Sequence, residues 1–179
     1  MSTESAVGTI WTIGHSTRSA EEFNHILDVH EIAVLVDVRS FPGSRRYPQF
    51  NKEKLKESLA AGGIRYHHSL ALGGRRRPNP KSKNLAWKNA SFRAYADHLE
   101  SDEFKQGVKE LLEVAAKERT ALMCAEALWW RCHRSLIADY LKSRGWEVLH
   151  IATEKQAEVH PYTSAARIVE GWLSYEGLF

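Results

Sequence analysis

Residues 9–38 read TIWTIGHSTRSAEEFNHILDVHEIAVLVDV, and this stretch decides the fold that the sequence predicts. Thr9–Ile13 is a short run of β-branched and aromatic residues that ends at a glycine, which is typical of a strand. Apolar residues then recur at helical spacing, and Ser19 followed by Glu22 forms a capping box that predicts the start of a helix. The apolar run Ile32–Val38 predicts a second strand. The stretch is therefore a strand–helix–strand unit.

The same alternation continues along the chain. Further strands are expected at Ile64–His68, Thr120–Cys124 and, as the final strand, Trp146–Ile151. Further helices are expected at Lys52–Ala61, at Ala90–Lys117 with a break near Ser101, and at Arg134–Ser143. A last helix is expected over His160–Phe179, around Ile168, Val169 and Trp172. Apolar strands that alternate with helices favour a parallel sheet that is covered on both sides. We therefore expect an α/β protein, a three-layer sandwich with a mainly parallel open sheet and helices on both faces.

The length and composition are those of one folded domain. The chain has 179 residues, of which 43 % are hydrophobic and 26 % charged, so disorder and coiled coil are excluded as global descriptions. The sequence shows no internal repeat and no linker composition. We expect a single α/β domain over residues 1–179, with a loose N-terminal extension at 1–8 and a long basic loop at 72–89.

Several features point to the cytoplasm. No run approaches the ~20 apolar residues that span a bilayer, and the N-terminal segment is polar and acidic rather than basic. The two cysteines form no disulfide framework and fit a reducing compartment. We expect a cytoplasmic location and no membrane partner.

The charge is distributed unevenly. Residues 38–96 carry 14 basic side chains against 2 acidic ones, whereas the chain as a whole has a net charge of +3. Within residues 65–93 the basic side chains are accompanied by Tyr66, Trp87 and Phe92, and Tyr95 follows closely. Such a block is either a solvated surface or a binding surface for a polyanion, on which aromatic rings stack on bases.

Chemically versatile side chains follow the predicted strands. Ligands of open parallel sheets bind outside the carboxyl ends of the strands, where helix N-termini offer free N–H groups. The candidate catalytic residues selected in this way are His15, Asp37, Glu126 and Cys132. The candidate ligand-binding residues are Arg39, Ser44, Arg45, Arg46, Gly73, Gly74, His133 and Arg134.

The segment with the most chemically versatile side chains is residues 122–134, LMCAEALWWRCHR. A thiol at position 132, in the first turn of a helix and beside a histidine and an arginine, is expected to have a lowered pKa and to be a nucleophile.

Other interpretations of this segment remain open. A phosphatase loop needs five residues between its Cys and Arg, but six separate Cys124 from Arg131. A zinc site would use Cys124, Cys132, His133 and His15, although no Cys-x2-Cys pair exists. Glu126 would otherwise act as a base or nucleophile, with Trp129 and Trp130 as a stacking platform.

Five separated motifs carry a family resemblance. They are TIGHS at 12–16, LVDVR at 35–39 with Pro42, Ser44 and Arg45, LGG at 72–74, CAE at 124–126 with CHR at 132–134, and His160-Pro161 with Thr163. In this order they closely resemble a prokaryotic family known as domain of unknown function 488 (DUF488), over Thr9 to about Arg167. The resemblance implies an α/β domain with Asp37, Arg39, Glu126, Cys132, His133 and Arg134 as motif positions, and it implies no reaction and no cofactor.

The leading hypothesis is a strand-end pocket that binds a phosphate-bearing ligand, a nucleotide or a nucleic-acid end, and acts on it as a hydrolase. Arg39, Arg45, Arg46 and Arg134 would hold phosphate, since the guanidinium fork matches its oxygens. His15 and Glu126 would transfer protons, Asp37 would orient a partner and Cys132 would be the nucleophile. One alternative is a non-enzymatic nucleic-acid-binding module that uses residues 65–93. A second is a thiol redox or metal-handling protein.

Overall fold

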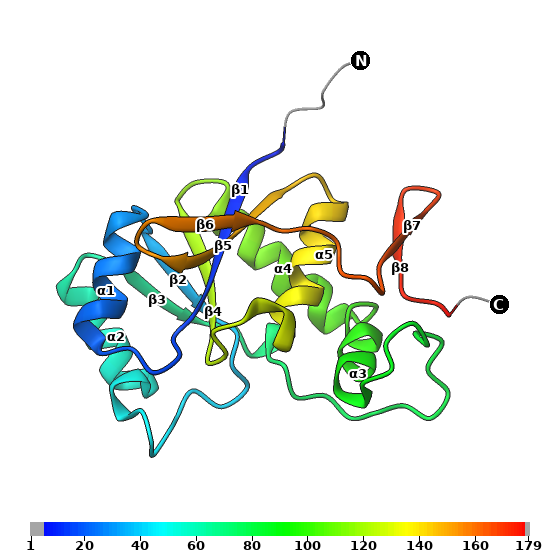
Figure 1. Ribbon diagram of the computed structural model, residues 1–179, viewed down its shortest axis with the longest axis horizontal. Coiled ribbons are helices and arrows are strands. Elements are labelled where there is room, and N and C mark those ends of the chain that lie inside the picture. The colour runs from blue at the N-terminus through cyan, green and yellow to red at the C-terminus, as the bar shows by residue number, and fades with distance from the viewer. Residues whose placement is uncertain (1–5, 178–179) are drawn as a thin grey trace.

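The computed structural model describes residues 6–177, and its main element is a six-stranded sheet in the order β3-β2-β4-β1-β5-β6 (Figure 1). The strands are β1 Thr9–Gly14, β2 Val34–Asp37, β3 Arg65–His68, β4 Thr120–Cys124, β5 Glu147–Thr153 and β6 Gln156–Val159. The first five run parallel, and β6 pairs antiparallel with β5. The predicted mainly parallel sheet is confirmed.

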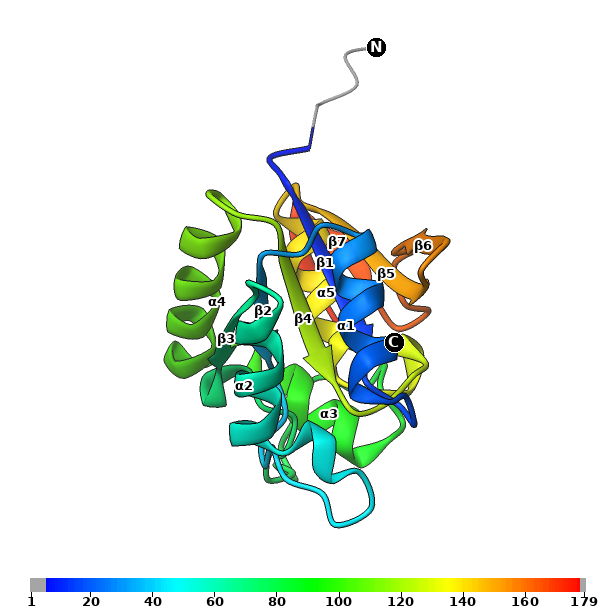
Figure 2. The ribbon, with the colours of Figure 1, turned by 90° about the vertical axis from the view of Figure 1, so that its left-hand side faces the viewer.

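Helices cover both faces of the sheet (Figure 2). They are α1 Ala20–Val29, α2 Lys52–Ala61, α3 Ala90–His98, α4 Asp102–Ala115 and α5 Arg134–Ser143. In β2, Leu35 packs with α1 and α2, whereas Val34 and Val36 pack with α4 and α5 on the opposite face. This alternation follows from the period of two along a strand. The three-layer sandwich is therefore confirmed.

Helix starts agree closely with the sequence. The Ser19 side chain accepts a hydrogen bond from the Glu22 N–H, and α1 begins at the next residue. The predicted break near Ser101 is also confirmed, because Ser101 caps α4 by accepting from the Phe104 N–H. In both cases a hydroxyl satisfies an N–H group that the first turn of the helix leaves free.

The predictions for the end of the chain were wrong in two respects. Trp146–Ile151 is not the final strand, because a tight turn after Thr153 returns the chain as β6. The expected helix over His160–Phe179 is instead a hairpin of β7 Arg167–Val169 and β8 Trp172–Ser174, which lies beyond α5 (Figure 1). Glu170 and Gly171 have positive φ angles of 52° and 85°, which a hairpin turn accommodates and a helix does not.

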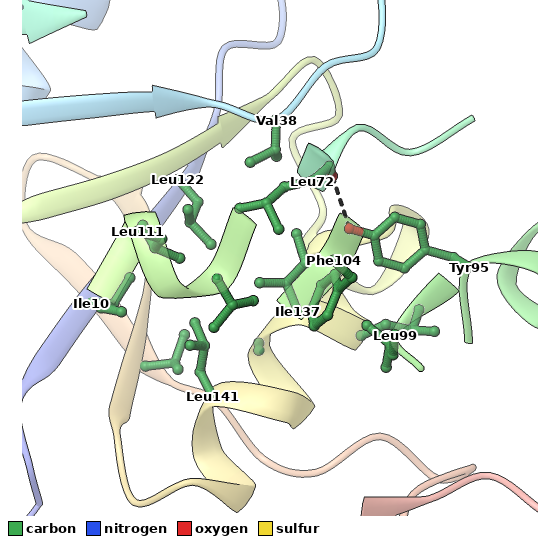
Figure 3. Close-up of a cluster of buried hydrophobic side chains, with 14 of the residues drawn as sticks. Ile10, Val38, Leu72, Tyr95, Leu99, Phe104, Leu111, Leu122, Ile137 and Leu141 are labelled. Carbon is green, nitrogen blue, oxygen red and sulfur yellow. Dashed lines mark hydrogen bonds between the residues drawn. The ribbon is translucent and has the colours of Figure 1, made fainter. Parts of the chain in front are cut away.

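The core on the α4–α5 face holds the loop after β3 in place (Figure 3). Leu72 is fully buried among Phe104, Leu122 and Ile137, and its carbonyl oxygen accepts a hydrogen bond of 2.8 Å from the Tyr95 hydroxyl. Residues 73–89 then form no helix or strand. The core thus fixes the position at which this basic loop starts.

Residues 7 and 8 are hydrogen-bonded to the chain around the start of β5. The Val7 N–H donates to the Gly145 carbonyl, and the Gly8 carbonyl accepts from the Glu147 N–H, while residues 1–5 of the expected extension lie outside the described part. Among residues 6–177, no helix combines the length and the apolar character that crossing a bilayer requires.

Candidate functional site

A cavity of about 770 Å³ lies at the carboxyl edge of the parallel strands. Segments that follow four strands line it: 15–17 after β1, 39–47 after β2, 74–75 after β3 and 124–133 at the end of β4. Ser91 and Phe92 in the first turn of α3 complete the wall. Parallel pairing of β4 with both β1 and β2 makes the segments after these three strands neighbours, although they are far apart in sequence.

Eight of the twelve candidate residues line this cavity. They are His15, Arg39, Ser44, Arg46, Gly74, Glu126, Cys132 and His133. Four do not: Asp37 and Arg134 are buried, Arg45 is exposed elsewhere, and Gly73 packs against Ser40. The lining also includes Phe41, Tyr47, Arg75 and Phe92, which were not among the candidates. Phe41, Tyr47 and Arg75 lie in loops, which helix and strand patterns do not describe, and Phe92 lies in the first turn of α3.

Asp37 and Arg39 form a buried ion pair under the cavity. Asp37 Oδ1 accepts from Arg39 Nε at 3.0 Å, and Oδ2 accepts from Arg39 Nη2 at 2.8 Å. The Tyr66 hydroxyl donates to the same Oδ2 at 2.6 Å, and burial with this carboxylate raises the Tyr66 pKa far above its usual value. Arg39 Nη2 also donates to the Phe50 carbonyl, and Nη1 is the one nitrogen of this guanidinium that bonds to neither Asp37 nor Phe50. The carboxylate fixes the orientation of the guanidinium.

His15 is neutral and presents a lone pair. Its Nδ1 donates to the Ser16 carbonyl at 2.8 Å, and its Nε2 faces Arg39 Nη1 at 3.5 Å. The ring stacks on Phe50, and burial lowers the His15 pKa to about 4. Because Nδ1 carries the hydrogen, Nε2 is the acceptor. The imidazole is therefore uncharged near neutral pH, and its lone pair faces the Arg39 guanidinium.

Cys124 and Cys132 lie in contact at the floor of the cavity, with their Sγ atoms 3.0 Å apart. Burial raises the Cys124 pKa, so this thiol keeps its hydrogen. Burial also acts to raise the Cys132 pKa, but hydrogen bonds with Cys124 and His133 and the charge of Arg134 outweigh it and hold that pKa well below its usual value. These contacts favour the thiolate form of Cys132. Cys132 lies two residues before the start of α5 rather than in the first turn of the helix, where the sequence placed it.

Arg134 is buried and holds the thiolate rather than facing the cavity. Its backbone N–H and its Nε donate to Cys132 Sγ at 3.2 and 3.4 Å. Its Nη2 donates to the Glu126 carbonyl at 2.6 Å, and its Nη1 donates to Thr12 Oγ1 at 3.1 Å. Each side-chain nitrogen of Arg134 therefore donates to a group of the protein itself. In this respect Arg134 differs from a residue that binds phosphate, which is the role that the sequence predicted for it.

Comparison with known families gives one match. The family model described as domain of unknown function DUF488 matches residues 19–141, about two thirds of the chain. The chain belongs to the DUF488 family. The match includes Asp37, Arg39, Glu126, Cys132 and Arg134. Comparisons with curated proteins and with solved structures find no significant match.

In this DUF488 protein a buried series of hydrogen bonds connects Arg134, beside the cavity, to Asp139 of α5. Arg134 donates to Thr12, and Thr12 Oγ1 lies 2.5 Å from His150 Nδ1. His150 Nε2 lies 2.8 Å from His160 Nδ1, and His160 Nε2 lies 2.8 Å from Asp139 Oδ1. One proton arrangement satisfies every link: each group donates to the next, from the guanidinium to the carboxylate, and both imidazoles are neutral.

We refer to Thr12, His150, His160 and Asp139 as the buried relay. Burial lowers the His150 pKa to about 2, which agrees with a neutral ring. Asp139 also accepts from Thr163 and Tyr175, so the carboxylate ties the tail to α5. The sequence did not predict the relay as a unit, although His160 and Thr163 belong to the family motifs. Two histidines ten residues apart give no periodic signal.

The tryptophans of the DUF488 loop have different surroundings. Trp129 stacks on His150 at 4.6 Å and covers the relay, whereas the Trp130 side chain is half-exposed. Neither residue lines the cavity. Among the described residues, no group of three or more His, Cys, Asp or Glu side chains has an arrangement that could hold a metal ion.

Gly14 is required by the close approach of two loops. A Cβ at this position would overlap the Glu126 carbonyl, which Arg134 also binds. We expect Gly14→Ala to lower the free energy of unfolding by about 1–3 kcal/mol, since the loop can move only by giving up contacts. Gly43→Ala is the matched control, because the nearest atom to its Cβ would be 3.9 Å away. Urea unfolding measures both variants, and equal stability of the two would contradict the close approach.

Proposed function

We propose that this DUF488 protein binds a nucleotide or another phosphate-bearing ligand in the cavity and hydrolyses it with Cys132 as the nucleophile. The supporting observation is the composition of the lining. The lining includes Arg46 and Arg75, the Asp37-paired Arg39, and Cys132, and Glu126 is its one carboxylate among the described residues. Guanidinium groups match phosphate oxygens, so this lining favours an anionic ligand.

The size and the aromatic content of the cavity favour a nucleotide over inorganic phosphate. A volume of about 770 Å³ falls in the range of pockets for small organic ligands. Phe41, Tyr47 and Phe92 line the cavity and offer ring faces for a base. Arg75 lies over the Phe41 ring at 5.1 Å and Arg46 lies over the Tyr47 ring at 5.5 Å. Each arginine covers one face of its ring, and a base would stack on the opposite face.

The proposed reaction has two steps. The Cys132 thiolate attacks phosphorus, an S–P bond forms and the bond from phosphorus to the leaving oxygen breaks. Water then attacks the same phosphorus, His15 Nε2 takes its proton, and the S–P bond breaks to restore the thiolate. The chemistry favours a phosphoanhydride, because its leaving group is a phosphate anion that departs without a proton from the protein.

The alternative module that uses residues 65–93 has less support. Its aromatic rings serve the fold: Tyr66 bonds to Asp37, Tyr95 is fully buried, and Trp87 packs against Phe92 and Tyr175. Of the aromatic residues named for base stacking in this block, Phe92 alone lines the cavity.

Binding of nucleoside diphosphates and triphosphates, measured by calorimetry, tests the proposal. We expect Arg46→Gln and Arg75→Gln each to lower affinity roughly tenfold or more, because each removes a hydrogen bond to a charged group worth about 1.5–3 kcal/mol. Arg167→Gln is the control, since this exposed arginine of β7 lies outside the lining. Cys132→Ser should retain binding and lose phosphate release. Unchanged binding in both cavity variants, or unchanged hydrolysis in Cys132→Ser, would refute the proposal.

A further inference from the structure

The two cysteines of the chain are placed as a pair that can bond. Cys124 ends β4, Cys132 precedes α5, and their Sγ atoms lie 3.0 Å apart. Because a disulfide bond is about 2.05 Å long, the sulfurs need to approach by roughly 1 Å. Both residues line the cavity, so a small molecule bound there reaches them.

We propose that Cys124 and Cys132 are a reversible dithiol–disulfide centre that exchanges with an anionic low-molecular-weight disulfide bound in the cavity. This activity goes beyond the proposed hydrolysis and does not depend on it, because it requires the sulfur pair and the cationic lining but no phosphorus chemistry.

The surroundings of the two sulfurs assign them different roles. Cys132 is partly exposed, and two N–H groups of Arg134 point at its sulfur, so it is the attacking thiolate. Cys124 is 4 % exposed and keeps its hydrogen, because burial raises its pKa. A buried thiol beside the attacking one is placed to resolve a mixed disulfide.

The exchange balances in two steps. The Cys132 thiolate attacks one sulfur of the small disulfide, forms a mixed disulfide and releases the other half as a thiolate. Cys124 then gives its proton to that thiolate and attacks Cys132 Sγ, which forms the internal disulfide and releases the second half. The two protein thiols are oxidised, and the small disulfide is reduced to one thiol and one thiolate.

Arg134 makes the oxidised form easy to reduce. In the reduced protein the buried guanidinium has the Cys132 thiolate as its adjacent anion, and the disulfide removes that charge. The nearest remaining carboxylate on its hydrogen-bond chain is Asp139, at the far end of the buried relay. Stabilisation of the reduced form raises the reduction potential of such a pair, so the disulfide belongs to the labile class rather than the structural one.

The lining selects the charge of the small disulfide. Arg46 and Arg75 are exposed at the cavity, and Glu126 is the one carboxylate among the described residues of the lining. A disulfide that carries carboxylates is attracted to this surface, whereas one that carries ammonium groups is repelled.

Exchange of the reduced full-length protein with oxidised glutathione tests the proposal. Acid-quenched samples are weighed by mass spectrometry, and released thiol is titrated. With oxidised glutathione in large excess, so that an easily reduced internal disulfide still accumulates, we expect a product lighter by two hydrogens and release of both glutathione halves. Cys124→Ser should stop at a mixed disulfide one glutathione heavier, and Cys132→Ser should react at least about tenfold more slowly. Cystamine, which is cationic, should react at least about tenfold more slowly than glutathione disulfide, and Arg46→Gln should narrow that difference.

Other outcomes would overturn the proposal. They are a wild-type product that remains at the mixed disulfide, covalent dimers in place of the internal bond, or reaction in denaturant but not in the folded protein. If a serine variant does not fold, as judged by circular dichroism, peptide mapping of the wild-type product decides the question. Retained exchange with no nucleotide hydrolysis would refute the proposed function and leave this proposal standing.

Discussion

Alkylation of Cys132 by iodoacetamide is expected to slow by less than about threefold between pH 8 and pH 6, whereas a thiol of ordinary pKa slows roughly a hundredfold over this range. The reason is the environment of the sulfur: Cys124, His133 and Arg134 hold the Cys132 pKa well below its usual value against the opposing effect of burial. The thiolate therefore persists as the pH falls. Rates are measured by mass spectrometry under pseudo-first-order conditions.

Two comparisons make this experiment decisive. Cys132→Ser leaves Cys124 as the one remaining thiol of the chain, and its buried, protonated sulfur should label at least about tenfold more slowly. Free cysteine in the same buffers provides the ordinary profile. A hundredfold loss of rate at Cys132 would show that its neighbours do not stabilise the thiolate.

Asp139→Asn is expected to lower the free energy of unfolding by about 2–4 kcal/mol, because a buried polar group left without a hydrogen-bond partner costs about 1–3 kcal/mol. Asp139 is fully buried and accepts hydrogen bonds from His160, from the N–H and hydroxyl of Thr163, and from the Tyr175 hydroxyl. An amide presents N–H groups toward some of these donors, which leaves buried groups without partners.

Urea unfolding measures this loss, with Glu158→Gln as the control. Glu158 is an exposed carboxylate of β6, so its substitution should cost less than about 0.5 kcal/mol. A second measurement separates positioning from stability. Under conditions in which Asp139→Asn remains folded, its Cys132 alkylation should depend more steeply on pH, because the relay no longer orients Arg134. A loss below about 1 kcal/mol would show that the relay contributes little.

The sequence predicted the parts of the fold that depend on local patterns. Ser19 and Ser101 mark helix starts because a hydroxyl caps the first turn, and that signal requires no tertiary information. The apolar runs Ile32–Val38 and Thr120–Cys124 predicted strands whose carboxyl ends carry the candidate site.

The parts that depend on contacts between distant residues were not predictable. The inward turn of Arg134 follows from acceptors at Thr12 and Glu126, which no helical period reveals. The tail forms a hairpin because Glu170 adopts a positive φ and Asp139 binds Tyr175, whereas its apolar spacing alone suggested a helix. Long-range hydrogen bonds decided both outcomes.

Protection of Cys132 from iodoacetamide by a nucleotide tests the central claim most directly, because it asks whether the thiolate and the arginines share one cavity. We expect alkylation of the wild type to slow to a saturable limit as nucleoside diphosphate is added, and the midpoint to shift to roughly tenfold higher concentration in Arg46→Gln. Nucleotide that binds by calorimetry and leaves the alkylation rate unchanged would contradict a shared site.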